Sequence, residues 1–164
     1  MFDAAKKRLT LNTVAPWRQS LRENGRALVV TNGCFDLLHA GHVSYLERAR
    51  NLGEALLIGL NGDGSVRELK GEGRPINGED DRALVLSGLG CVDGVCVFPE
   101  MRADRFLDLV QPDIYVKGGD YTVETLDKNE RAAVERHGGR IEILSFVAGK
   151  STTATLEKMQ KTGE

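Results

Sequence analysis

The sequence is poor in cysteine, and its cysteines show no spacing that suggests a metal knuckle or a disulfide scaffold. The three cysteines are Cys34, Cys91 and Cys96, an odd number without a C-x-x-C pair. A disulfide framework normally uses an even set, and zinc knuckles use closely spaced pairs. Neither feature therefore organises this chain, and a reducing cytoplasm is the expected compartment.

Long apolar runs and an excess of basic residues are also missing. No segment approaches the roughly 18 apolar residues that cross a bilayer, and the start "MFDAAKKRLT" has no apolar core of a secretory signal. The net charge is −2, with acids and bases interspersed, whereas nucleic-acid binders usually carry a basic excess. We expect no membrane partner and no nucleic-acid partner.

Strand-like and helix-like segments alternate along the chain. The apolar runs "RALVVTN" and "EALLIGLN" predict strands buried on both faces, and apolar residues at helical spacing lie between them. Three further strand-like runs follow, each separated by a helical segment. The sequence therefore predicts an α/β fold with a single Rossmann-like, doubly wound, mostly parallel five-stranded sheet. We expect a leader helix within 1–24 and one domain over 25–164.

The segment 62–77 holds four glycines and a proline, so we expect it to be mostly loop, followed by a helix that Asn77 caps. In doubly wound sheets, ligands bind at the carboxyl ends of the strands. That rule directs attention to four segments, which are 32–42, 61–77, 117–121 and 146–153.

The stretch "TNGCFDLLHAGH" carries the strongest chemical signal. Gly33 permits close backbone approach after the first long strand, and His39 and His42 are spaced to point the same way from a first helical turn. Two imidazoles at a helix N-terminus can hold a phosphate and stabilise charge that grows in a transition state. Three alternatives stay open, namely ordinary helix capping, a zinc site without a third nearby ligand, and a dinucleotide site without the G-x-G-x-x-G pattern.

The other three segments are weaker alone. "AGKSTTATLEK" lacks the glycine that a P-loop needs five residues before Gly149, yet its hydroxyls suit either a phosphate cradle or a simple helix cap. "LKGEGRPIN" offers Lys70 and Arg74 in a lid-like loop or as solvated charges. "VKGGDY" offers close backbone contact at Gly118, or merely a turn. All four segments fall at one predicted sheet edge, which favours a shared anion site.

Taken together, "GCFDLLHAGH" and the later "STT" resemble the two signatures of the cytidylyltransferase-like nucleotidyltransferases. With "LKGEGRPIN" and "VKGGDY", the chain is most similar to the adenylyltransferase branch that makes ADP-heptose. The glycerol 3-phosphate branch carries Arg-Thr where this chain has Phe146-Val147. The resemblance spans about residues 25 to 159 and implies a nucleotidyltransferase of the H-x-G-H type.

The implied reaction is attack of D-glycero-β-D-manno-heptose 1-phosphate on the α-phosphorus of ATP, with release of pyrophosphate and without a protein nucleophile. The resemblance implies catalytic roles for His39, His42 and Lys70, and acceptor binding by Asp36 and Arg74. The residues that it implies for nucleotide or phosphate binding are Asn32, Gly33, Cys34, Phe35, Gly41, Arg82, Lys117, Gly118, Asp120, Ser151, Thr152 and Thr153.

The resemblance also sets expectations about cofactors and partners. Mg²⁺ is expected to accompany ATP, held mainly by phosphate oxygens rather than by protein side chains. We expect a homodimer, and a separate kinase that supplies the heptose 1-phosphate. Two alternatives stay open, a cytidylyltransferase acting on glycerol 3-phosphate or a similar small phosphate, and a nucleotide-binding module without catalysis.

Overall fold

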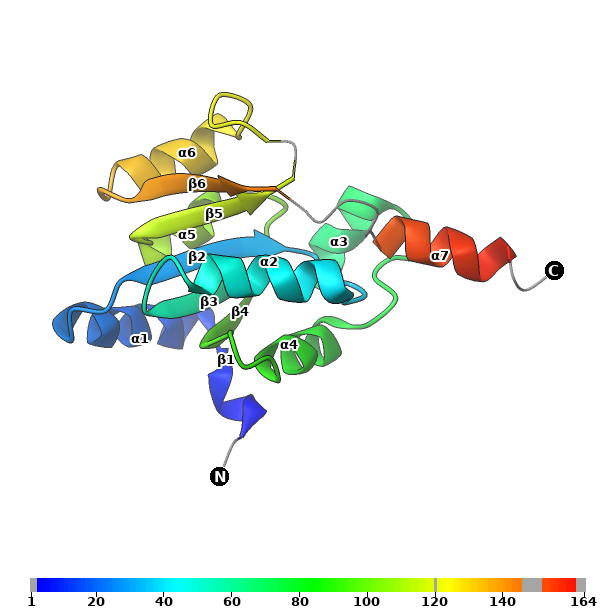
Figure 1. Cartoon of the computed structure of the whole chain (residues 1–164), viewed down its shortest axis with the longest axis horizontal. Helices are drawn as coiled ribbons and strands as arrows, with labels where there is room; N and C mark the ends of the chain where they lie inside the picture. Colours follow the sequence, from blue (N-terminus) through cyan, green and yellow to red (C-terminus); the bar gives the residue numbers. More distant parts are fainter. Residues whose placement is uncertain (1–2, 120, 146–151, 162–164) are drawn as a thin grey trace.

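The computed structural model describes residues 3–119, 121–145 and 152–161. Its centre is one sheet in which every neighbouring pair of strands is parallel, in the order β1-β4-β3-β2-β5-β6 (Figure 1). The α/β parallel sheet is as predicted, but the described residues form six strands and not five. The strands are β1 (Arg8–Leu9), β2 (Leu28–Gly33), β3 (Ala55–Asn61), β4 (Gly94–Phe98), β5 (Ile114–Gly118) and β6 (Arg140–Leu144).

The additional strand lies in the expected leader. β1 pairs with β4 at one edge of the sheet, with Arg8 opposite Val95. It follows a short 3-10 helix, η1 (Ala4–Lys7), and precedes α1 (Leu11–Glu23). A two-residue strand is too short to show a period of two, so sequence reasoning missed it. α1 buries Val14 and Leu21 against the sheet, so this segment contributes to the hydrophobic core.

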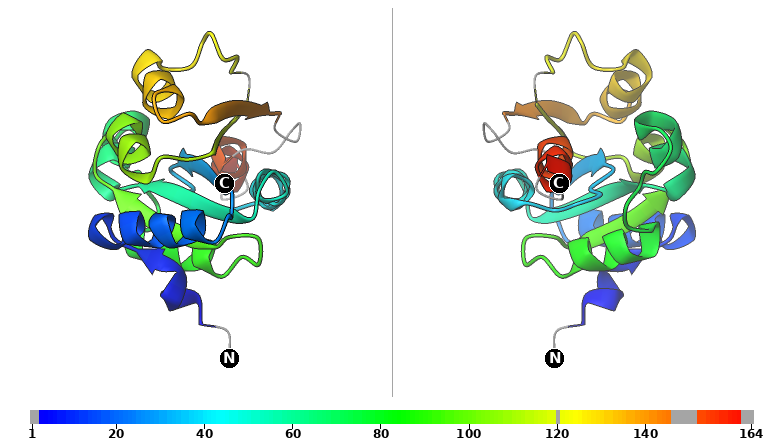
Figure 2. Two further views of the ribbon diagram at one scale, coloured as in Figure 1. Left: turned by 90° about the vertical axis from the view of Figure 1, so that its left-hand side faces the viewer. Right: turned by 90° about the vertical axis from the view of Figure 1, so that its right-hand side faces the viewer.

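Helices cover both faces of the sheet, and alternate residues of each strand serve the two faces. Val30 of β2 packs in the cluster that includes α1, α5 (Asp104–Val110) and α6 (Lys128–Glu135). The adjacent Val29 packs in the other cluster, with α2 (Ala40–Arg50) and α4 (Glu79–Ser87). Figure 2 shows the sheet end-on between α1, α5 and α6 on one side and α2 on the other. This burial on both faces explains the continuous apolar runs of the central strands.

The expected loop 62–77 contains a helix, α3 (Asp63–Lys70), which corrects the prediction. Gly62 caps its start and Gly71, with φ +94°, ends it, so these two glycines delimit a helix. Buried Ser65 and Val66 hold α3 against the body. α4 likewise starts after Gly78 rather than at Asn77.

The last helix, α7 (Thr152–Lys161), lies beyond the end of the sheet toward which β2, β5 and β6 point (Figure 1). Among the described residues, no helix has the length and apolar character needed to cross a membrane.

Candidate active site

A cavity of about 600 Å³ opens at the carboxyl ends of β2, β3 and β5. Three of the four segments selected from sequence contribute to it, as the position of ligand sites in doubly wound sheets predicts. The predicted residues that line it are Asn32, Gly33, Cys34, Phe35, Asp36, His39, His42, Lys70, Arg74, Lys117 and Gly118.

The two histidines sit at the start of α2 with their rings in contact. Their centroids are 4.0 Å apart and the ring planes differ by 31°. His39 is the N-cap, and its Nδ1 accepts a hydrogen bond from the Gly41 amide at 3.1 Å. His42 Nδ1 accepts from the His39 amide at 3.3 Å. Each neutral ring therefore carries its proton on Nε2, which makes Nε2 a hydrogen-bond donor.

The protonation of His42 is set by its surroundings. Burial, together with the neighbouring His39, lowers the pKa of His42 from 6.5 to about 4. His42 is therefore a neutral donor across the physiological pH range. Gly41 is buried in the first turn and contributes its amide to the His39 cap rather than lining the cavity.

Gly33 and Phe35 shape the backbone in front of these rings. Phe35 adopts φ +44°, an uncommon left-handed conformation for an aromatic residue. Its ring lies 5.5 Å from the His42 ring and also fills the space beside Gly33. A Cβ at Gly33 would come within 3.0 Å of Phe35 Cε2, so a side chain at this position would displace the Phe35 ring. Close packing against the Phe35 ring thus favours glycine at position 33.

Lys70 and Arg74 bring positive charge to the cavity by different means. Lys70 is the last residue of α3, is exposed, and its ammonium has no ion-pair partner in the part of the chain that the structure describes. Arg74 is mostly buried, and its Nε donates to Asp36 Oδ2 at 2.7 Å. Lys70 is therefore the more available of the two for a phosphate oxygen.

Asp36 anchors the loop between α3 and α4. Its carboxylate, 1% exposed, accepts hydrogen bonds from the Ile76 and Asn77 amides as well as from Arg74. Burial alone would raise the pKa of Asp36, but these donors outweigh burial and lower it. Asp36 was predicted to contact the acceptor substrate. Its carboxylate oxygens already accept hydrogen bonds from the protein, so Asp36 instead positions the loop. The Asn77 side chain is engaged as well, since its Nδ2 donates to the Asp36 carbonyl oxygen at 3.3 Å, and Gly78 is the N-cap of α4.

Arg82 is a buried clamp rather than a surface that a nucleotide can reach. Its side chain is fully buried, and its donors bind the carbonyl oxygens of Cys34 (2.7 Å), Asn61 (2.9 Å) and Asn77 (3.0 Å) and the Asp63 carboxylate (2.8 Å). The nucleotide or phosphate contact expected of Arg82 is therefore not available to it. Arg82 instead ties the loop after β2 to the end of β3 and to the segment before α4.

The opposite side of the cavity holds a polar cluster that sequence reasoning recognised only in part. The Lys117 ammonium donates to Asn32 Oδ1 (3.1 Å), to the Tyr115 hydroxyl (3.0 Å) and to Glu130 Oε2 (3.2 Å). Glu130 Oε1 accepts from the Ala103 amide at 3.1 Å. Burial and the Glu130 charge raise the pKa of Tyr115 well above its usual range. Lys117 thus has its three donors engaged within the protein, which leaves none for the nucleotide or phosphate contact expected of it.

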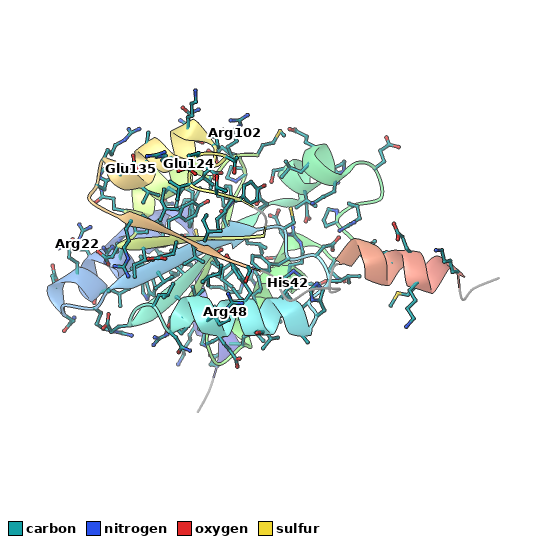
Figure 3. The ribbon with its side chains drawn as sticks, turned by 45° about the horizontal axis from the view of Figure 1, so that its top comes forward. Arg22, His42, Arg48, Arg102, Glu124 and Glu135 are labelled. Atoms are coloured by element: carbon teal, nitrogen blue, oxygen red, sulfur yellow. The ribbon has the colours of Figure 1, made fainter. Side chains whose placement is uncertain are left out.

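Other lining residues were not predicted. Arg102, from the loop before α5, forms an ion pair with Asp127 at the rim, and Figure 3 labels Arg102 and His42. Asp127 caps α6, and Glu130 stands three residues later. Both acids occur in a helix that is polar on sequence, where nothing distinguishes a cavity-facing acid from a solvated one. The lining residues without a prior assignment are Tyr45, Asn61, Leu69, Met101, Arg102, Tyr121, Leu126, Asp127 and Glu130.

Cys34 lies at the cavity as an intermediate-exposure thiol. Burial raises its pKa, and this effect exceeds the lowering by Lys70 and the nearby arginines. A protonated thiol is a poor nucleophile, so Cys34 fits a spectator role. Asp120 and Ser151 lie outside the described residues, as do the side chains of Thr152 and Thr153 and the pair Phe146-Val147.

The carboxylates at the cavity are committed to protein donors. Asp36 and Glu130 accept the hydrogen bonds given above, and Asp127 accepts from two amides of α6 and pairs with Arg102. Within the described ranges, no group of three His, Cys, Asp or Glu side chains could hold a metal ion.

Comparisons with known proteins agree with this architecture. The family model described as cytidylyltransferase-like matches residues 30–155. The chain is 48% identical over 158 residues to the bifunctional protein HldE of Geotalea uraniireducens, covering 96% of this chain and 32% of the relative. It is 54% identical over 139 residues to HldE of Alkalilimnicola ehrlichii, covering 85% and 29%. The chain thus spans about a third of the length of these relatives.

Among solved structures, the fold is similar to the crystal structure of the lipopolysaccharide core biosynthesis protein from Thermoplasma volcanium GSS1. The TM-score is 0.61 at 28% sequence identity, and the match covers 75% of this chain and 98% of that one.

Proposed function

Because this chain belongs to the cytidylyltransferase-like family and is a nucleotidyltransferase, we propose that it transfers the adenylyl group of ATP to D-glycero-β-D-manno-heptose 1-phosphate. The product is ADP-heptose, a precursor of the lipopolysaccharide core. Two findings support this choice of substrate class. The chain is about half identical to HldE proteins, and its structure is similar to a protein titled for lipopolysaccharide core biosynthesis.

The observation that carries the proposed chemistry is the histidine pair. The Nδ1 atoms of His39 and His42 accept hydrogen bonds from backbone amides, and the His42 ring offers an Nε2–H donor at the cavity wall. Such preorganised donors stabilise charge that develops on phosphate oxygens. They require no proton transfer during the reaction, which suits the pKa of about 4 for His42.

The reaction balances without a covalent enzyme intermediate. A phosphate oxygen of the sugar phosphate forms a bond to the α-phosphorus of ATP, and the bond from that phosphorus to the bridging oxygen of the β-phosphate breaks. Pyrophosphate leaves with the electron pair. The protein contributes positioning of the two substrates and stabilisation of charge, to which exposed Lys70 adds a cation. Mg²⁺, bound mainly by phosphate oxygens, would supply further charge neutralisation.

The test is pyrophosphate release with ATP or CTP, each paired with heptose 1-phosphate or glycerol 3-phosphate. We expect ATP with heptose 1-phosphate to give the highest kcat/KM. Faster turnover of CTP with glycerol 3-phosphate would favour the cytidylyltransferase alternative. If no pair is turned over, the alternative of a nucleotide-binding module without catalysis would be favoured. The homodimer and the separate kinase remain predictions, to be checked by sedimentation and by phosphorylation assays respectively.

A further inference from the structure

The polar cluster of Asn32, Tyr115, Lys117 and Glu130, here called the Glu130 network, has a role that the proposed reaction does not yet use. We propose that Glu130 is a positioning residue that fixes the Asn32 carboxamide, so that Asn32 Nδ2 donates a hydrogen bond to an oxygen atom of a bound substrate. The inference rests on the proposed function, since it deepens the recognition of the substrates in that cavity.

The hydrogen bonds at Asn32 define the orientation of its side-chain amide. Asn32 Oδ1 lies 3.1 Å from the Lys117 ammonium, which can only donate, and 2.6 Å from the Tyr115 hydroxyl. A flipped amide would place its own N–H groups against the ammonium, which is unfavourable. Asn32 is therefore held with Oδ1 toward the network. Its Nδ2 has no hydrogen-bond partner among the residues with described placement, and Asn32 lines the cavity.

A neighbouring negative charge keeps Lys117 in place. Lys117 is 16% exposed and Glu130 is 7% exposed in their side chains. A mostly buried ammonium is costly without a paired anion. Glu130 provides that anion, and its second oxygen is fixed by the Ala103 amide at the start of α5. Removing the Glu130 charge would release Lys117 toward solvent and free the Asn32 amide to rotate.

The oriented Asn32 amide determines which chemical class of ligand can bind next to it. An Asn32 amide with its oxygen occupied presents only N–H donors to the cavity. It therefore recognises hydroxyl, carbonyl or phosphate oxygens and disfavours a substrate group that can only donate. Lys117 acts through Asn32, because its three donors are engaged within the network.

The test is a double-mutant cycle on kcat/KM with Glu130→Gln, Asn32→Ala and the combined variant. We expect Asn32→Ala to lower kcat/KM by about ten- to a hundredfold, as the loss of a hydrogen bond to a charged group does. Glu130→Gln should lower it about tenfold alone, but less than about threefold when Asn32 is already alanine. Additive losses, or a folded Glu130→Gln protein with wild-type kcat/KM, would overturn the proposal.

A control and a second variant keep the cycle interpretable. Glu135→Gln makes the same chemical change on the same helix, where Glu135 pairs with Arg131 at 2.8 Å on the exposed face (Figure 3). It should leave kcat/KM within about twofold. If thermal unfolding shows that Glu130→Gln does not fold, Tyr115→Phe replaces it in the cycle. Its effect on kcat/KM must then also be non-additive with that of Asn32→Ala.

A readout without substrate separates this inference from the proposed function. The side-chain amide signals of Asn32, identified by their loss in Asn32→Ala, should shift in the nitrogen–proton NMR spectrum of Glu130→Gln and stay in place in Glu135→Gln. Unmoved Asn32 signals overturn the positioning role even if ATP and heptose 1-phosphate turn over. If that pair fails with the wild-type protein, the proposed function fails, and the cycle is measured with the pair that the substrate panel identifies.

Discussion

The two sides of the cavity are built in different ways. The histidine side comes from one short segment, in which Gly33, Phe35, His39 and His42 are set by local hydrogen bonds and ring contacts. The Glu130 network is assembled from β2, β5 and α6, with partners up to 85 residues apart in sequence. The first side can be interpreted from a motif, whereas the second exists only when the sheet has formed.

The local segment nevertheless depends on distant residues. Arg82 binds the carbonyl of Cys34, and Asp36 holds the loop from 74 to 77. The histidines are placed locally, but the loop that presents them is fixed by tertiary contacts.

Removing the clamp should have the largest effect, and it should act on stability. We expect Arg82→Met to lower the free energy of unfolding by about 3 kcal/mol, because it leaves three carbonyl groups and the Asp63 carboxylate without their donor. Urea unfolding measures this. Arg67→Met, on the exposed side of α3, serves as the control and should change stability by less than about 0.5 kcal/mol. Equal effects of the two changes would refute the clamp.

The next effect is catalytic and concerns the histidine side alone. His42→Ala should lower turnover by at least about a hundredfold, since it removes a preorganised donor. Pyrophosphate release under saturating substrates measures it. His137→Ala changes a histidine that pairs with Asp108 outside the cavity, and its turnover should match the wild type. A folded His42→Ala protein with near-normal turnover would remove His42 from the mechanism.

Lys70 tests whether a cavity cation without an ion-pair partner in the described part of the protein acts on the substrate rather than on stability. Lys70→Met should lower kcat/KM by about tenfold, because a charged hydrogen bond to phosphate is lost. Its thermal unfolding should be unchanged, since the exposed ammonium has no ion-pair partner within the described residues. Lys70→Arg should recover part of the loss. A fall in stability with unchanged kinetics would assign Lys70 a structural role instead.

The pH dependence of stability offers a smaller effect. His42 has its pKa lowered to about 4 in the folded protein, against 6.5 ordinarily. Between these values the unfolded chain binds the proton and the folded protein does not, so stability falls as pH falls from about 6.5 to about 4. Allowing for partial exposure, the contribution is about 1 kcal/mol. Urea midpoints at pH 7 and pH 5 should differ less for His42→Gln than for the wild type. An equal difference would contradict the lowered pKa.

The smallest effect is expected at Cys34. Its thiol stays protonated because burial raises its pKa, so Cys34→Ala should change kcat/KM by less than about threefold. Steady-state kinetics measure this, and Cys91→Ala, away from the cavity, is the matched control. A loss of a hundredfold specific to Cys34 would give the thiol a direct role.

Several features were predictable from sequence because they depend on near neighbours. The parallel α/β sheet follows from continuous apolar strands alternating with helices, and the family follows from short strings such as "GCFDLLHAGH". The predictions for two elements, β1 and α3, were wrong for identifiable reasons. β1 is too short to show periodicity, and the glycines around α3 end a helix rather than extend a loop.

The sheet, the edge at which its cavity lies and the spacing of His39 and His42 follow from the amino-acid sequence alone, because they depend on periodicity and on residues a few positions apart. Which polar side chains can reach a ligand depends instead on the folded protein. In the sequence, nothing distinguishes Lys117, Asp36 and Arg82 from residues that could bind a ligand. In the structure, their polar atoms form hydrogen bonds with other groups of the protein. Burial makes those bonds obligatory, since an unpaired polar group inside the protein is costly, and the partners are brought together only by the fold.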